Sequence, residues 1–217
     1  MTENINPIGL IVTIASLSVL PLVAVTCTSF LKISAVLLIL RNAIGVQQVP
    51  SNMVLYGISM VMTLLVMGTV LADAGKRFAP DGKMPVSGVE VLDSINAATP
   101  PFKKFMLANT DEQYLSSFHQ TAIQFQKKYS AAPVEKTDLF VVMPAFVASE
   151  LADAFRIGLY LYLPFVIIDL AVSSALMALG MMMVSPMSLT VPAKIVLFVA
   201  VEGWAKVLQG LVNSYLL

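Results

Sequence analysis

Long uncharged stretches alternate with one polar stretch along the chain. Residues 4–31 contain no charged side chain, and neither do residues 53–72. Apolar sequence returns from residue 139 and continues to residue 217. Because about 20 apolar residues in a helix cross the hydrocarbon core of a bilayer, hydropathy alone predicts four membrane segments, arranged as two helical hairpins.

Prolines and glycines indicate that these helices are kinked. A first helix from about Ile8 meets Pro21, where it should kink or restart. Gly45 and Pro50 lie in a short polar stretch that predicts a turn. After this turn Ser51 or Asn52 can cap a helix that runs from residue 53 to about residue 72.

The polar stretch, residues 73–138, carries 16 of the 26 charged residues, eight of each sign. This balance predicts a water-exposed, mostly helical insertion, with a loop over residues 78–88. Asp111 should cap an amphipathic helix near 111–129, whose polar side carries an exposed His119. Its apolar side more often packs on its own protein than on lipid, and it consists of Tyr114, Phe118, Ala122, Phe125 and Tyr129.

The last apolar part, residues 139–217, forms the second predicted hairpin. Pro144 should start or kink its first helix, and Pro164 should bend it. Within it, residues 170–193 are 24 uncharged residues in which Gly180 and Pro186 break the helix. Four soft methionines lie in or beside this break, in the loop 180–187: Met181, Met182, Met183 and Met187. Flexible thioether side chains fill cores and also adapt to varied surfaces; the residues alone favour core filling, with a deformable apolar constriction as the alternative.

Seven charged side chains lie inside or beside apolar runs, where an unpaired charge is costly. Glu150, Asp153 and Arg156 spread over one side of a helix, which allows contact between Asp153 and Arg156. Two hypotheses follow: a proton or ion relay, or ion pairs that fix how helices or subunits dock. The second is favoured because no stepwise carboxylate path is present, and the full set is Lys32, Arg41, Glu150, Asp153, Arg156, Asp169 and Lys194.

Composition narrows the function classes. Hydrophobic residues make up 58% of the chain and charged residues 12%, which is typical of a membrane protein. The net charge of zero gives no basis for nucleic-acid binding. With Cys27 and His119 as the single cysteine and histidine, we expect neither a metal site nor a disulfide. No phosphate-binding or dinucleotide-binding glycine motif occurs, so no cofactor is expected and the chain is not expected to be an enzyme.

Two other functions are compatible with the charged residues. A small-solute or proton-coupled transporter could use Glu150, Asp153 and Asp169. An intramembrane hydrolase could use Glu150 with Asp153 as acid and base, although no protease motif supports it.

Basic residues also bear on orientation. No Lys or Arg precedes Lys32, so the basic region of a signal peptide is missing, and we expect residue 4 onward to remain in the mature protein. Lys32 and Arg41 flank the first turn, which the positive-inside rule places in the cytoplasm. The insertion would then face outward.

Three patches together resemble a known family. The first is TSFLK at 28–32 with LRNAIGVQQVP at 40–50; the second includes SE at 149–150, LPF at 163–165 and IDL at 168–170; the third is GMMMVSP at 180–186. The chain resembles the FliP/SctR family, the core export-apparatus subunit of type III secretion systems, and is more similar to the injectisome branch than to the flagellar one.

The resemblance implies a ring of five copies in the bacterial inner membrane, around a pore that conducts unfolded secreted proteins. It implies four copies of the smaller S-type partner and one T-type partner, with the switch subunit, the large export-gate subunit, the inner rod or needle, and membrane lipids nearby. The family's methionine gasket, which closes the pore, corresponds to Met181, Met182 and Met183. It also implies bent hairpins, residues 1–72 and 139–217, that are lifted largely out of the bilayer plane and pack on neighbouring subunits.

Overall fold

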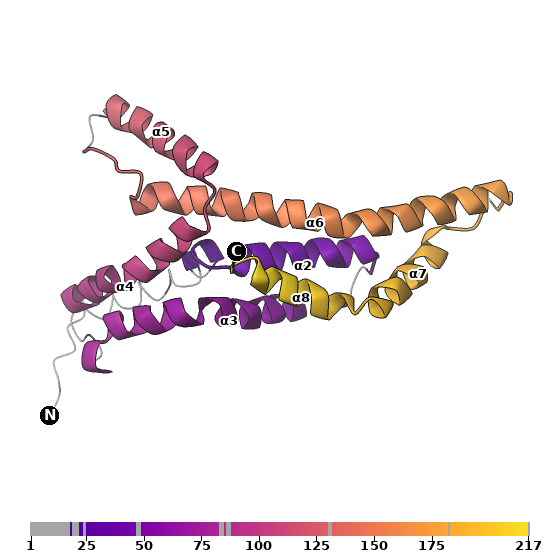
Figure 1. Cartoon of the computed structure of the whole chain (residues 1–217), viewed down its shortest axis with the longest axis horizontal. Coiled ribbons are helices and arrows are strands. Elements are labelled where there is room, and N and C mark those ends of the chain that lie inside the picture. Colours follow the sequence, from indigo (N-terminus) through magenta and orange to yellow (C-terminus); the bar gives the residue numbers. More distant parts are fainter. Residues whose placement is uncertain are drawn as a thin grey trace. The chain divides into compact units, whose positions relative to one another are not determined.

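The chain is helical throughout the part that its computed structural model describes, which is residues 18, 22–23, 25–46, 49–82, 85, 88–129, 132–181 and 183–216. Within these residues there are seven α-helices, a short 3-10 helix at Pro80–Gly82 and no strand (Figure 1). The predicted all-α fold class is therefore confirmed. The helices are α2 (Phe30–Ile44), α3 (Asn52–Phe78), α4 (Gly88–Ala108), α5 (Glu112–Tyr129), α6 (Leu139–Ala178), α7 (Met187–Ala200) and α8 (Gly203–Asn213).

Two of these helices, α3 and α6, are long and apolar enough to cross a membrane. Helices α7 and α8 are long and apolar enough only when they are taken together, and the pair is bent by 63° at a short break. The described residues thus offer two spans, or three if the bent pair counts as one, and the expectation of four membrane segments stays a prediction. The first predicted segment, including the start near Ile8 and the kink at Pro21, lies largely outside the described residues.

Several helix ends differ from the predicted ones. Helix α6 begins at Leu139, ahead of Pro144, and continues through both Pro144 and Pro164 as one helix of 40 residues. Pro144 therefore does not start this helix, whereas a kink at Pro144 and a bend at Pro164 stay predictions. A proline removes one backbone hydrogen bond, whereas apolar surroundings favour keeping all the others within the helix. Helix α3 extends to Phe78, and its last turn carries Lys76 and Arg77, cations that a helix C-terminus stabilises.

The chain consists of two compact units. The first unit comprises residues 1–31 and 66–150, and the second comprises residues 32–65 and 151–217. Helices α3 and α6 contribute residues to both. This grouping does not test the three sequence segments 1–72, 73–138 and 139–217, which stay a prediction.

The first unit has its own apolar core, in which α4, α5 and the start of α6 take part. Helix α4 was not predicted, since Pro100 and Pro101 lie inside it and hide its periodicity. The buried members of this core are Cys27, Met106, Leu115, Val141, Val142, Ala145 and Phe146.

Helix α5 packs on this core as far as Ala122, whereas its last two turns do not. Asp111 Oδ1 accepts a hydrogen bond of 2.8 Å from Gln113 N, which is the expected N-cap. Of the apolar side, three residues pack against the core, while Phe125 and Tyr129 are 58% and 67% exposed and stack on one another. The three that pack are Tyr114, Phe118 and Ala122.

Two polar contacts tie the segment after α5 back onto this helix. His119 is half-buried, and its Nε2 lies 3.2 Å from the carbonyl oxygen of Val134, so the expectation of an exposed histidine was wrong. Its helical face is polar, but Val134 of the following segment lies against it. Lys136 donates a hydrogen bond to Glu112, and this contact lowers the pKa of the Glu112 carboxyl below its ordinary value.

In the second unit α2 contributes more buried core residues than any other described helix. Its buried residues pack with side chains from α3, α6, α7 and α8, and Phe165 and Phe198 approach within 6.4 Å between ring centroids. Gly158 in α6 allows a close approach to α2, because a Cβ there would lie 2.7 Å from Ile39 Cδ1. The α2 residues of the core are Ile33, Val36, Leu37, Leu40, Ala43 and Ile44.

Candidate functional site

The break between α6 and α7 has a defined backbone geometry. Helix α6 ends at Ala178, and Gly180 follows with φ of +72°, a conformation that glycine adopts without strain. Met181 N donates to the carbonyl of Leu176 at 2.9 Å, and Gly180 N donates to the carbonyl of Met177 at 3.0 Å. These two bonds form a Schellman motif, which satisfies carbonyls at the end of the helix. Gly180 thus ends α6 and redirects the chain into the loop that leads to α7.

Helix α7 then restarts directly after Pro186. Pro186 has φ of −54°, close to the helical value. Ser188 Oγ donates to the carbonyl of Ser185 at 2.8 Å, so the first turn of α7 is tied to the loop before it. The loop therefore joins two well-formed helix ends over only a few residues.

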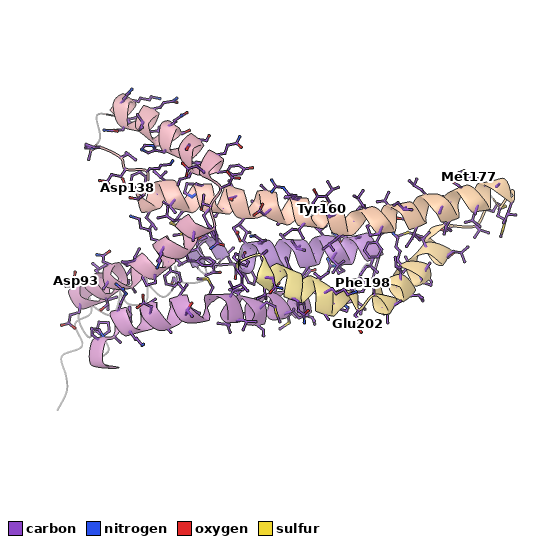
Figure 2. The ribbon with its side chains drawn as sticks, in the orientation of Figure 1. Asp93, Asp138, Tyr160, Met177, Phe198 and Glu202 are labelled. Carbon is purple, nitrogen blue, oxygen red and sulfur yellow. The ribbon has the colours of Figure 1, made fainter. Side chains whose placement is uncertain are left out.

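The methionines of this loop face solvent rather than a core within the chain. Met181 is 43% exposed, Met183 is 102% exposed and Met187 is 52% exposed. Met182 lies outside the described residues. Met177, which Figure 2 labels close to the end of α6, is 62% exposed as well. A loop of this composition presents a soft apolar surface that the chain by itself does not cover.

Lys194 and Asp169 meet in the second unit. The Lys194 ammonium lies 2.6 Å from Asp169 Oδ2 and donates to the carbonyl of Ala43 at 3.1 Å. The Lys194 side chain is only 6% exposed, whereas that of Asp169 is 41% exposed. The cation is therefore the buried member, and it links α7 to α6 and to the end of α2.

A second group of charges surrounds Asp153. Its carboxylate lies 3.6 Å from the Lys32 ammonium and 3.4 Å from Arg156 Nη1. Lys32 is nearly buried, and its ammonium also lies 4.2 Å from the centre of the Tyr215 ring, where a cation–π interaction adds to the ion pair. The sequence contained no indication of Tyr215, which lies far along the chain from Lys32.

The remaining two predicted charges are Arg41 and Glu150. Arg41 donates to the carbonyl of Pro50 at 3.4 Å and to Asn52 Oδ1, so it braces the turn between α2 and α3. Glu150 belongs to the first unit and is fully buried. Whether any of the seven charges docks one subunit on another stays a prediction.

The region described contains no group of three or more His, Cys, Asp or Glu side chains that could hold a metal ion. The candidate functional features are therefore the exposed methionine loop and the two ion pairs that link helices, Lys32–Asp153 and Lys194–Asp169.

The family model described as FliP family matches residues 13–211. This chain belongs to the FliP family. The predicted FliP/SctR identity is confirmed, and with it membership of the type III secretion export apparatus.

Three relatives of this FliP-family chain align over nearly their whole length. "Harpin secretion protein HrcR" of Erwinia amylovora is 44% identical over 215 residues, which is 99% of both chains. "Yop proteins translocation protein R" of Yersinia pestis is 40% identical over 216 residues, again 99% of both chains. "Surface presentation of antigens protein SpaP" of Salmonella typhimurium is 36% identical over 219 residues, 97% of each chain.

Proposed function

We propose that this chain is a pore-forming core subunit of a type III secretion export gate, which conducts unfolded proteins across the bacterial inner membrane. The observation that carries the proposal is the solvent-facing methionine loop between α6 and α7, in which Met183 is 102% exposed. A loop that packed its methionines as core filling would bury them. Membership of the FliP family and the secretion-related names of the relatives support the same function.

Assembly into a ring accounts for the apolar surface that the single chain leaves open. Soluble monomers rarely expose large contiguous apolar patches. Helix α6 alone exposes Phe155, Leu159, Tyr160, Leu163, Ile167 and Leu170 by 47–66%. We propose that copies of this chain, together with the S-type and T-type subunits, cover part of this surface, and that the insertion faces the periplasm.

In the proposed ring the methionine loops of neighbouring copies meet at the centre. A narrow apolar constriction excludes hydrated ions, because water withdraws from it. Unbranched thioether side chains change shape easily, so they can yield to polypeptides of many sequences and close again. Energy for transport must come from other components, since the chain contains no nucleotide-binding motif.

A transporter that uses carboxylates of this chain receives little support from their surroundings. Asp153 already lies within 4 Å of two cations and Asp169 within 4 Å of one. Uptake of solute by the chain reconstituted without partner subunits would favour the transporter over the export gate.

The gate is tested by ion conductance of the assembled complex in planar bilayers. Replacing Met181, Met182 and Met183 together by Ala should raise the resting conductance, because shorter side chains leave a wider, wetter constriction. A matched control replaces Met53 and Met60 by Ala; both are exposed, at 84% and 48%, but lie in α3. Unchanged conductance in a fully assembled loop variant would reject the gasket role.

A further inference from the structure

The bend between α7 and α8 contains a strained residue. Glu202 has φ of 54° and ψ of 42°, the left-handed conformation that a residue with a Cβ disfavours. Among the residues that the structure describes, it is the one non-glycine residue with a positive φ. Figure 2 labels Phe198 and Glu202 at this bend, which measures 63°. No proline occurs in residues 193–213, so the bend does not arise from a missing backbone donor.

Packing within the second unit holds the bend. The Phe198 ring lies against the backbone of Gly203, where an added Cβ would meet it at 2.1 Å, and it meets the Trp204 ring edge-on at 5.4 Å between centroids. The bend also folds α8 onto the second-unit core, in which Val207 and Leu211 are buried. This burial stabilises the bent form wherever water is the alternative, because it removes apolar surface from water.

The backbone beside Glu202 already has the hydrogen bonds of a continuous α-helix. Lys206 N donates to the carbonyl of Glu202 at 3.2 Å, and Val201 N donates to the carbonyl of Leu197 at 3.1 Å. Right-handed backbone angles at Glu202 would join α7 and α8 into one helix over residues 187–213. Taken together, the two helices are long and apolar enough to cross a membrane.

The straight helix would also give two charges a partner. Glu202 and Lys206 are four residues apart, in the order that favours an ion pair on a helix. In the bent form these two side chains form no salt bridge with one another or with any other described residue. A pair of this kind lowers the cost of holding both charges within an apolar span.

The solvent decides between the two forms. Lipid tails are as apolar as a protein core, so in a bilayer the packing of Val207 and Leu211 on α2 gains no hydrophobic free energy. The strain at Glu202 is the same in both solvents. A bilayer therefore favours the straight helix, and surroundings of water and packed protein favour the bent one.

We infer that Glu202 is a two-state hinge. In a bilayer the unassembled chain holds α7 and α8 as one membrane-crossing helix, and α8 folds back onto α2 when the chain leaves the lipid to pack on partner subunits. The bent form of Figure 1 is the assembled one, in keeping with helices that are lifted out of the bilayer plane. Hinges are residues of this kind, which absorb large changes in φ and ψ. The folding step rests on the proposed assembly, whereas the straight form in lipid does not.

The test measures a distance across the bend by double electron–electron resonance. Nitroxide labels are attached at Leu189→Cys in α7 and Asn213→Cys in α8, both exposed, in the full chain with Cys27→Ala. A straight helix separates the two labelled backbone positions by about 36 Å, and the bend of 63° shortens this distance to about 31 Å. The longer distance should predominate in phosphatidylcholine nanodiscs without partner subunits. The shorter one should predominate in the complex with the S-type and T-type subunits, when labelled copies are diluted by unlabelled ones.

Glu202→Gly tests the hinge itself. Glycine adopts left-handed angles without strain, so in nanodiscs this variant should shift the ratio of the short to the long distance about five- to thirtyfold toward the short one. Ala205→Gly is the matched control, because residue 205 is exposed and lies within α8, so it is helical in both forms. It should leave the ratio unchanged.

Three results would overturn the hinge: a short distance alone for the wild type in nanodiscs, no shift in Glu202→Gly, or an equal shift in Ala205→Gly. A long distance that persists in the complex would overturn the folding of α8 on assembly. The nanodisc measurement contains no partner subunit, so its result does not depend on the proposed export gate. Failure of the gate and failure of the hinge are therefore distinguishable.

Discussion

Replacing Asp169 by Asn should destabilise the second unit more than removing its partner Lys194. After this substitution the Lys194 ammonium, 6% exposed, keeps the carbonyl of Ala43 at 3.1 Å but has lost the carboxylate at 2.6 Å. Removing one partner of a buried ion pair costs about 3–5 kcal/mol, because an uncompensated charge stays in apolar surroundings.

The reverse substitution, Lys194→Met, should be milder. It removes the buried charge itself and leaves a carboxylate that is 41% exposed, which water can hydrate. The main loss is the hydrogen bond to the carbonyl of Ala43, and leaving such a group unsatisfied costs about 1–3 kcal/mol. Adding Lys194→Met to Asp169→Asn should therefore recover stability, because the stranded cation disappears.

Thermal unfolding in detergent, followed by tryptophan fluorescence, measures these differences. The chain contains one tryptophan, Trp204, and its ring lies 5.4 Å from that of Phe198 in the second-unit core. At about 2–4 °C per kcal/mol for a chain of this size, Asp169→Asn should lower Tm by roughly 6–20 °C.

The exposed pair of Asp73 and Arg77, each about half exposed, provides the control: Asp73→Asn should change stability by about 0–1 kcal/mol. Equal losses for the two single variants, or a double variant less stable than Asp169→Asn, would refute the assignment of Lys194 as the buried member.

Three further predictions concern other contacts. Gly203→Ala should cost about 1–3 kcal/mol, because a Cβ at Gly203 would lie 2.1 Å from the ring of Phe198; the same fluorescence assay should show no loss for Gly210→Ala, and equal effects would contradict the clash. Ser149→Ala removes the hydroxyl that accepts a hydrogen bond of 3.0 Å from Asp111 N, at the cap of α5. The free energy that protects α5 amides from hydrogen exchange should therefore fall by about 1 kcal/mol. Lys136 holds the pKa of Glu112 below its ordinary 4.5, so their contact stabilises the fold above pH 4.5 and is lost as the pH falls through the lowered pKa. Hydrogen exchange of α5 amides, corrected for intrinsic rates, should become faster in that pH range in the wild type. An identical increase in Glu112→Gln would show that the Glu112–Lys136 contact is not its cause.

Local features of the chain were predictable because their causes span only a few residues. Asp111 caps α5 through a bond to the N–H two residues later. Gly180 ends α6 because its positive φ and two short-range hydrogen bonds need no distant partner. The all-α class follows in the same way from long apolar stretches, in which the backbone N–H and C=O groups must form hydrogen bonds with one another within each helix.

Other features were mispredicted because local and tertiary preferences compete. Pro144 is a residue that can start a helix, yet α6 begins five residues earlier, at Leu139, and continues through it. His119 looked exposed from its helical face, but it is half-buried and its ring contacts the carbonyl of Val134, 15 residues later. Helix α4 was missed because its two prolines interrupt the apolar period.

The sequence by itself determined that this FliP-family chain is helical and apolar, with charges that need partners and a methionine-bearing break after Gly180. Only the tertiary structure decided which partners those charges take: Lys194 reaches Asp169, 25 residues away, and Ala43, 151 residues away. The physical reason is range. Backbone conformation and capping depend on neighbours within about one helical turn, whereas a buried ammonium finds its acceptors only where packed helices bring distant segments together.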